Sequence, residues 1–133
     1  MDSTTLPRYF EDLQIPPHVQ VVAVSKTKSV DHIRDVYRAG FRNFGENYLQ
    51  EALPKIMALR DLPDIRWHFI GQLQSNKTKA VVEVFDMVQS VDSIKLAQKL
   101  DLTCQTIQKR LPVLIQINIG QEPQKGGVLL ANL

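Results

Sequence analysis

Lys26 is the residue whose type and position best suit it to chemistry. It follows the apolar run Val21–Val24 almost directly, so its side chain is expected to leave a sheet core with little water around it. Burial favours the neutral amine, and a nearby second cation does the same. Lys28 lies two residues on and would point to the same side of an extended segment. A lysine activated in this way is a nucleophile toward an aldehyde. The alternative is that both lysines are solvated residues of a surface loop.

Polar residues also gather where later apolar runs end. These groups are Gly45–Asn47, Gly71–Lys77, Ser90–Asp92 and Asn118, with Lys125 a little later. Functional residues of parallel α/β folds lie just past the C-terminal ends of strands, so the groups predict one polar, lysine-rich rim. A structural reading stays open for each of them. Gly45 and Asn47 could serve only as a turn and a helix cap, and the segment 74–77 could cap a helix or hold an anion on its backbone N–H groups.

His68 lies inside the apolar run Trp67–Ile70, which favours a hydrogen-bonded core histidine over a catalytic base. No part of the sequence has the spacing of metal ligands, so no metal site is expected. Neither a G-x-S-x-G elbow nor a G-x-x-x-x-G-K-[ST] phosphate loop occurs. The motifs therefore predict no catalytic residue of these classes.

Five apolar runs, typical of strands covered on both faces, are spaced along the chain. They are Val19–Val24, Phe41–Phe44, Trp67–Ile70, Met87–Val91 and Val113–Ile119. Four helices are expected between them. Ser29 should cap the first, which carries Val30, Ile33 and Val36 and ends at Gly40. The second should carry Leu49 to Leu59, with Glu51 four residues before Lys55 and a kink or a late start at Pro54.

Ala80, Val81, Val84 and Phe85 form the apolar face of a third expected helix. Ser93 should cap the fourth, which carries Ile94, Ala97, Leu100, Cys104 and Ile107. Strict alternation of strand and helix predicts an α/β fold with a parallel sheet, and no linker divides residues 1–133. The pattern alone does not distinguish an open doubly wound sheet from part of a barrel.

The composition is that of an ordinary cytoplasmic globular protein. Of 133 residues 44% are hydrophobic, and the formal charge is only +2. Nucleic acid binding is not favoured, because no dense basic run is present. One cysteine, Cys104, is consistent with a reducing compartment. No apolar run is long enough to span a membrane, and the first fourteen residues do not have the pattern of a secretory signal.

Four blocks together resemble the pyridoxal phosphate homeostasis protein family, whose members are relatives of the alanine racemase N-terminal barrel. The blocks are Val22–Lys28 (VAVSKTK), Phe44–Glu51 (FGENYLQE), Trp67–Lys77 (WHFIGQLQSNK) and Val113–Ile119 (VLIQINI), and Lys125 and Gly127 resemble the pair that follows the last of them. The blocks keep the family's order over residues 19 to 128. The second and third are the most specific.

The resemblance implies a (β/α)8 barrel, incomplete here with about five strands and four helices, that holds pyridoxal 5'-phosphate on Lys26 as an internal aldimine. It also implies that Lys28 and Lys125 are auxiliary lysines and that Asn47 lines the ring pocket. Three features depart from the family. Ser29 stands where proline is usual, and the Ser/Gly-rich segments that hold the cofactor phosphate have no counterpart after Lys125. The family's N-terminal helix is also shortened here, to Leu6–Leu13.

Three functions follow as hypotheses. The first is a non-catalytic cofactor-binding protein of vitamin B6 homeostasis. The second is a racemase- or aldolase-like enzyme domain that uses the same lysine, although a racemase would need an opposing acid or base from another domain. The third is a truncated chain that no longer binds the cofactor tightly. Five strands cannot close an eight-stranded barrel, so self-association or pairing with a missing C-terminal half is expected.

Overall fold

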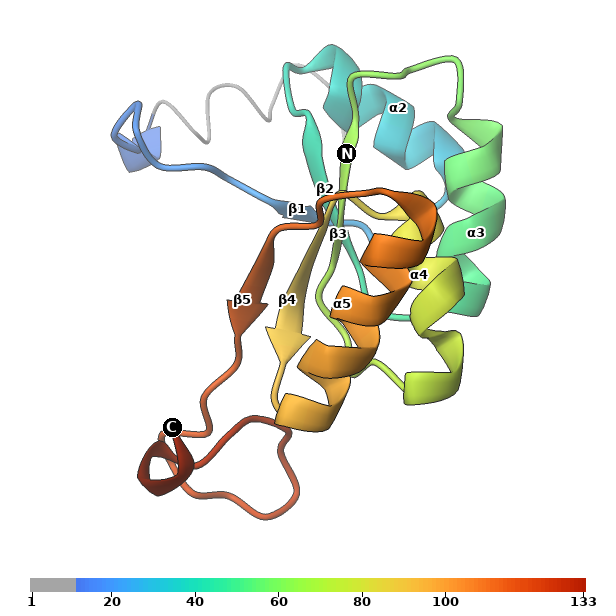
Figure 1. Cartoon of the computed structure of the whole chain (residues 1–133). Helices are drawn as coiled ribbons and strands as arrows, with labels where there is room; N and C mark the ends of the chain where they lie inside the picture. Colours follow the sequence, from blue (N-terminus) through green and yellow to red (C-terminus); the bar gives the residue numbers. More distant parts are fainter. Residues whose placement is uncertain (1–11) are drawn as a thin grey trace.

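A computed structural model describes residues 12–133, in which strands and helices alternate along the chain (Figure 1). The strands are β1 (Ala23–Val24), β2 (Asn43–Glu46), β3 (Arg66–Phe69), β4 (Met87–Val91) and β5 (Val113–Ile115). The helices are α2 (Val30–Arg38), α3 (Leu49–Ala58), α4 (Thr78–Val84) and α5 (Ile94–Ile107), with short 3-10 turns η1 (Ser75–Lys77) and η2 (Leu130–Asn132). Most of the expected N-terminal helix, Leu6–Leu13, lies outside the described residues.

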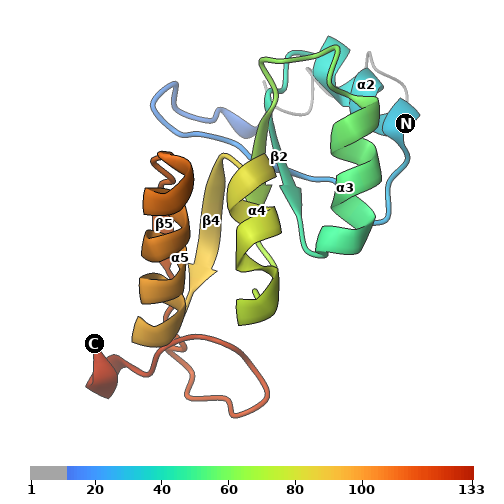
Figure 2. The same ribbon diagram turned by 45° about the vertical axis from the view of Figure 1, so that its right-hand side comes forward.

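The five strands form one sheet in the order β1-β2-β3-β4-β5, and every neighbouring pair is parallel. The helices all lie on the same side of this sheet in both views (Figures 1 and 2). An open doubly wound sheet would reverse its strand order and carry helices on both faces. The sequential order and the single helical layer are instead those of a (β/α)8 barrel cut open.

The hydrophobic core lies between the sheet and the helical layer. Phe44 and Trp67 sit side by side on β2 and β3, with ring centroids 5.9 Å apart, and Phe69 packs edge-on against Phe85 at 5.2 Å. The fully buried members include Ile33, Phe44, Leu59, Val81, Val82, Phe85 and Val88. The opposite face of the sheet, which a closed barrel would enclose, carries polar side chains. A row of hydrogen bonds crosses it from Gln20 to Asn43, His68 and Gln89.

The helix caps agree with the sequence in two places. Ser29 Oγ accepts a hydrogen bond from His32 N at the start of α2, and Ser93 Oγ accepts one from Leu96 N at the start of α5. Gly40 has a φ of +109° just past α2, a conformation that side chains other than glycine's rarely adopt.

Helix α3 begins at Leu49 and runs through Pro54, so of the two alternatives for this proline the late helix start is excluded. The expected apolar face of the fourth helix is wrong at Ile94. Ile94 is 77% exposed, because it lies in the first turn of α5 where the helix turns away from the sheet, and Leu96 is buried in its place. Between residues 12 and 133, no helix has both the length and the apolar character needed to cross a membrane.

Candidate functional site

The C-terminal ends of the strands carry the polar residues that the sequence groups together. Lys26 and Lys28 follow β1, and Asn47 follows β2. Lys125 lies on the loop after β5. This loop folds back over the strand ends. Gly127 N donates to Asp92 Oδ2 at 3.2 Å, and a Cβ added to Gly126 would lie 3.5 Å from Gln72 Nε2. The strand ends therefore form one polar rim, as the sequence predicts.

The segment that carries Lys26 is a tight turn and not an extended strand. Lys28 N donates to Ser25 O at 3.0 Å, and Thr27 adopts a left-handed φ of +65°. The inference that Lys28 points to the same side as Lys26 in an extended segment therefore does not apply. Ser25 N donates to Gly45 O at 2.9 Å, which fixes the start of the turn to β2.

Lys26 is exposed, which contradicts the expectation that little water surrounds it. The expectation assumed that the sheet core covers the end of β1. The helix-free face of this five-stranded sheet is open there, and Val24, two residues before Lys26, is 52% exposed for the same reason. Among residues 12–133, the Lys26 amine makes no hydrogen bond or ion pair. Lys26 is close enough to Glu51 to help lower the pKa of that carboxyl.

A cluster of charged side chains lies beneath this turn, with Glu46 and Lys55 buried and Glu51 half-buried. Lys55 Nζ on α3 lies 2.7 Å from Glu46 Oε1 and 2.8 Å from Glu51 Oε1, and it donates to Ser25 O at 2.8 Å. The contact between Lys55 Nζ and Glu46 Oε1 is within ion-pair distance but does not have hydrogen-bond geometry. The attraction between these two atoms is therefore electrostatic. Glu46 Oε2 accepts from Ser25 Oγ at 3.2 Å, and Glu51 Oε1 also accepts from Thr27 N.

The charges of this cluster are mutually stabilised. Burial works against the Lys55 ammonium, but its hydrogen bond to Glu51 and its Coulomb attraction to the Glu46 and Glu51 carboxylates outweigh the burial, so the pKa of Lys55 is raised. The hydrogen bonds from Lys55 and from Thr27 N lower the pKa of Glu51. Sequence reasoning noted Glu51 and Lys55 only as a helical pair. A lysine on the apolar face of α3 was the available signal, since an unpaired lysine is rarely buried.

Asn47 is held by a close backbone approach. A Cβ added to Gly71 would lie 2.0 Å from Asn47 O, so only glycine fits where the β3–α4 loop passes the end of β2. Asn47 Oδ1 is buried and has no hydrogen-bond partner among the described residues. The Asn47 side chain thus offers an unsatisfied acceptor at the rim.

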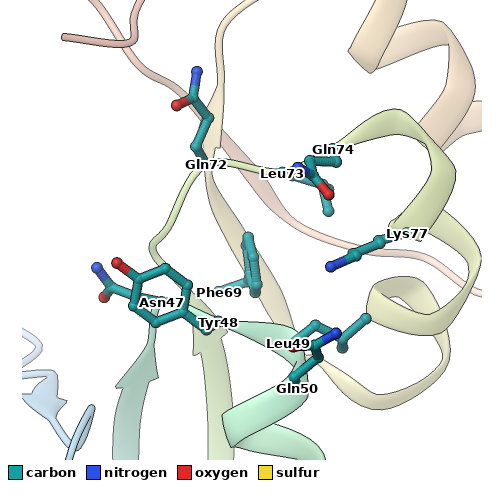
Figure 3. Close-up of a pocket in the computed structure, with 9 residues that line it drawn as sticks. All are labelled: Asn47, Tyr48, Leu49, Gln50, Phe69, Gln72, Leu73, Gln74 and Lys77. Carbon is teal, nitrogen blue, oxygen red and sulfur yellow. The ribbon is translucent and has the colours of Figure 1, made fainter. Parts of the chain in front are cut away.

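A pocket of about 440 Å³ opens beside Asn47, between the loops that follow β2 and β3. Figure 3 shows Lys77 reaching from η1 toward the middle of this pocket, with Gln50 of α3 opposite it. Lys26, Lys28 and Lys125 are not among its lining residues. The pocket therefore neighbours the rim without joining the predicted lysines.

The structure brings the predicted residues to one rim but not into mutual contact. Lys125 is paired with Glu122 at 2.6 Å, and its side chain is 65% exposed. No hydrogen bond or ion pair within residues 12–133 links Lys125 to Lys26 or Asn47. His68 is buried, as expected, and both its ring nitrogens are hydrogen-bonded. The described residues contain no group of three His, Cys, Asp or Glu side chains that could hold a metal ion.

Several known proteins with similar sequences share one name. The chain is 48% identical over 113 residues to the pyridoxal phosphate homeostasis protein of Synechocystis sp., covering 85% of this chain and 52% of that protein. It is 43% identical over 120 residues to the protein of the same name from Escherichia coli K12, covering 89% and 51%. The chain spans about half the length of the curated relatives it matches.

Solved structures agree with this relationship. PipY of Synechococcus elongatus, determined without PLP, superposes with a TM-score of 0.90 at 42% identity and covers 96% of this chain and 60% of that one. The PLP-bound form of PipY gives a TM-score of 0.88 at 41% identity, with coverage of 96% and 59%. Alanine racemase from Bartonella henselae shares the fold at 19% identity, with a TM-score of 0.75 over 99% of this chain and 37% of that one.

A family profile described as alanine racemase, N-terminal domain, matches residues 10–133. This match includes every strand and helix described above and the turn that carries Lys26. The chain belongs to the alanine racemase N-terminal domain family.

Proposed function

We propose that this chain binds pyridoxal 5'-phosphate through the Lys26 amine and serves vitamin B6 homeostasis as a non-catalytic carrier. The observation that carries the proposal is the state of Lys26. Its amine lies at the C-terminal edge of β1, exposed and without an ion-pair partner in the described chain, while its backbone is fixed by a buried polar cluster. The relatives of the same name, and the PLP-bound form of PipY, support the choice of ligand.

The residues present fit such a ligand. Bound pyridoxal phosphate supplies an aldehyde carbon that bonds to an amine and a phosphate group that needs cations and hydrogen-bond donors. Lys26 offers the free amine, and Lys28 adds a second exposed ammonium on the same turn. Asn47 Oδ1 is an unsatisfied acceptor, which fits a donor such as the ring hydroxyl of the ligand and not its phosphate. Lys125 would add its charge from the loop after β5, in exchange for its pair with Glu122.

A racemase- or aldolase-like enzyme is the weaker reading of the same site. Proton transfer needs a group that can release and take up a proton next to the ligand. His68 has both ring nitrogens hydrogen-bonded on the sheet, and Glu51 is committed to Lys55 and Thr27. Neither is free to act as a base. A cytoplasmic location, inferred from the composition and the single cysteine, belongs to the same proposal.

Borohydride reduction after mixing the chain with pyridoxal phosphate tests the assignment. We expect peptide mapping to find the pyridoxyl group on Lys26, and the Lys26→Ala variant to lose it. Lys95→Ala, which removes an exposed lysine of α5, is the matched control and should label normally. Label found mainly on Lys28, Lys77 or Lys125 would contradict the assignment.

A titration of the same chain measures affinity. The relatives extend well beyond the part that this chain matches, and each charge-assisted hydrogen bond to the phosphate contributes about 1.5–3 kcal/mol. We therefore expect the 133-residue chain to bind several orders of magnitude more weakly than a full-length relative. Equal affinity would show that the phosphate contacts come from the residues present here.

A further inference from the structure

We infer that Glu51, supported by Lys55 and Glu46, is a positioning residue that holds the Lys26 turn in the conformation needed for ligand binding. The inference rests on the proposed function, because it assigns Lys26 the role of binding the ligand. It concerns a cluster on α3 and β2 that lies beneath the turn and does not itself reach the ligand.

The contacts are directed at the backbone on both sides of Lys26. The carbonyl oxygen of Ser25 belongs to the peptide group before Lys26, and it accepts from Lys55 Nζ at 2.8 Å. The N–H of Thr27 belongs to the peptide group after Lys26, and it donates to Glu51 Oε1. Two neighbouring side chains of α3 therefore fix both peptide groups next to the Lys26 Cα. The Lys26 side chain itself remains free.

The turn needs this support because its conformation is unfavourable in isolation. Thr27 is β-branched and adopts a φ of +65°, a region that such residues rarely occupy. Conformations of this kind persist only where surrounding contacts determine them, and they concentrate at functional sites. The hydrogen bond from Thr27 N to Glu51 is the contact that acts on this residue directly.

Glu46 has a role in the cluster that differs from the role of Glu51. Glu46 is 1% exposed and would be costly to bury without the Lys55 charge. Glu46 in turn holds Ser25 Oγ, so β2, α3 and the turn are joined through three side chains. A fixed backbone at Lys26 sets the point from which the free side chain extends and so limits the region that its amine can reach, which favours bond formation with a bound aldehyde.

Three substitutions of Glu51 separate geometry from charge. Glu51→Gln keeps an oxygen that can accept from both Thr27 N and Lys55 Nζ, since both partners use the same oxygen, Oε1. Glu51→Asp keeps the charge but is one methylene shorter, so it cannot reach both partners. Glu51→Ala removes both contacts. Asp61→Ala is the matched control, because it breaks the Arg34–Asp61 ion pair on the far side of the helical layer.

The measurement is the rate at which the Lys26 amine bonds to pyridoxal phosphate with loss of water. Samples are quenched over time with borohydride and mapped, and the folded fraction of each variant is followed by circular dichroism. We expect Glu51→Asp and Glu51→Ala to slow labelling of Lys26 by roughly ten- to a hundredfold, the value of one hydrogen bond to a charged group. The share of label on Lys28 should rise. Glu51→Gln and Asp61→Ala should stay within about threefold of the unmodified chain.

The outcomes are distinguishable from failure of the proposed function. If the unmodified chain does not label at Lys26, the proposed function is wrong. If the unmodified chain labels at Lys26 and every Glu51 variant labels as fast as the unmodified chain does, the positioning role is wrong while the proposed function stands. Slow labelling of Glu51→Gln with normal labelling of Glu51→Asp would also overturn the inference, in favour of a charge effect. Should Glu51→Ala fail to fold, the Asp and Gln variants decide the question between them.

Discussion

At the scale of single residues, the lysines differ in what their ammonium groups contact. Lys55 is saturated by two carboxylates and a carbonyl, Lys109 donates to the carbonyls of Val82 and Phe85 at the end of α4, and Lys125 pairs with Glu122. These amines are engaged in structural contacts. Lys26 has no such partner within residues 12–133, a state that it shares with Lys28, Lys77, Lys79, Lys95 and Lys99, so its place at the end of β1 and its fixed backbone distinguish it.

His68 predicts a loss of stability in mild acid. The amide nitrogen of Gln89 can only donate, so His68 Nδ1 accepts and Nε2–H donates to Asn43 Oδ1. Burial lowers the pKa of His68, so the unfolded chain takes up a proton at a higher pH than the folded chain. The free energy of unfolding should be constant well above pH 6.5 and fall below it, by at most about 1.4 kcal/mol per pH unit.

Denaturant unfolding at pH 7.5 and at pH 5.5 measures this effect. The carboxyl groups with lowered pKa values, Glu51, Asp61 and Asp64, act only below their ordinary values of 4.5 and 3.8 and do not interfere. His68→Gln should reduce the fall in the free energy of unfolding between pH 7.5 and pH 5.5. His18→Gln, which changes an exposed histidine, should leave this fall unchanged. A loss that persists unchanged in His68→Gln would assign it to another group.

Gly71 predicts a strong steric effect next to Asn47. An added Cβ would lie 2.0 Å from a backbone oxygen that cannot rotate away, so Gly71→Ala should destabilise the chain by about 1–3 kcal/mol or more. Gly120→Ala is the control, because the atoms nearest to its added Cβ are 3.6 Å away and belong to a flexible side chain. Thermal unfolding of both variants checks this, and equal effects would contradict it.

At the scale of elements, the helices position the site more than the strands do. Helix α3 carries Glu51 in its first turn and Lys55 in its last, and the turn before α2 carries Lys26. The row of hydrogen bonds from Gln20 to Gln89 joins the strands on the other face of the sheet. The strands thus hold the rim as a whole, while side chains of α3 hold the backbone of the turn that carries Lys26.

Ser93 predicts a measurable contribution to the stability of α5. Its hydroxyl accepts from Leu96 N at 3.1 Å, which satisfies one otherwise unpaired donor of the first turn. Ser93→Ala should lower the free energy of unfolding by about 1 kcal/mol. Thr106→Ala removes a hydroxyl that only bonds to the carbonyl of Leu102 in the same helix, so it should be neutral or slightly stabilising. Chemical denaturation of the two variants separates capping from a general loss of hydroxyl groups.

At the scale of the whole molecule, the open sheet determines behaviour in solution. Strand β5 lies at one end of the sheet and pairs only with β4. All three of its side chains are apolar and exposed, from 43% at Val113 to 60% at Ile115. An apolar edge strand with free N–H and C=O groups is a template for pairing with another chain.

Self-association through this edge is therefore expected. Sedimentation velocity over a range of concentrations should show oligomers of the unmodified chain, and Ile115→Lys should shift the distribution toward monomer, because a charge on the edge opposes pairing. Leu102→Lys, which changes an equally exposed residue on α5, is the control. A chain that stays monomeric throughout, or equal effects of both lysine substitutions, would contradict a role for the β5 edge.

The sequence by itself determined the local features of this protein. Apolar runs located all five strands to within a few residues, and Ser29, Gly40 and Ser93 marked the helix ends, because caps and periodicity depend on neighbours a few positions apart. The four sequence blocks also identified the family to which the chain belongs. Lys26, Lys28, Asn47 and Lys125 remain predictions as ligand-binding residues.

Only the tertiary structure decided how these elements and residues meet. Strand order and the placement of all helices on one face exclude the doubly wound alternative, which has the same alternation in sequence. The exposure of Lys26 depends on whether other parts of the fold cover the helix-free face of β1. The residues around Lys26 in the sequence do not indicate this. The contact between Lys55 and Ser25 O spans thirty positions. Its partners are a side chain and a backbone oxygen, and a backbone oxygen occurs at every residue, so the sequence alone does not identify this contact.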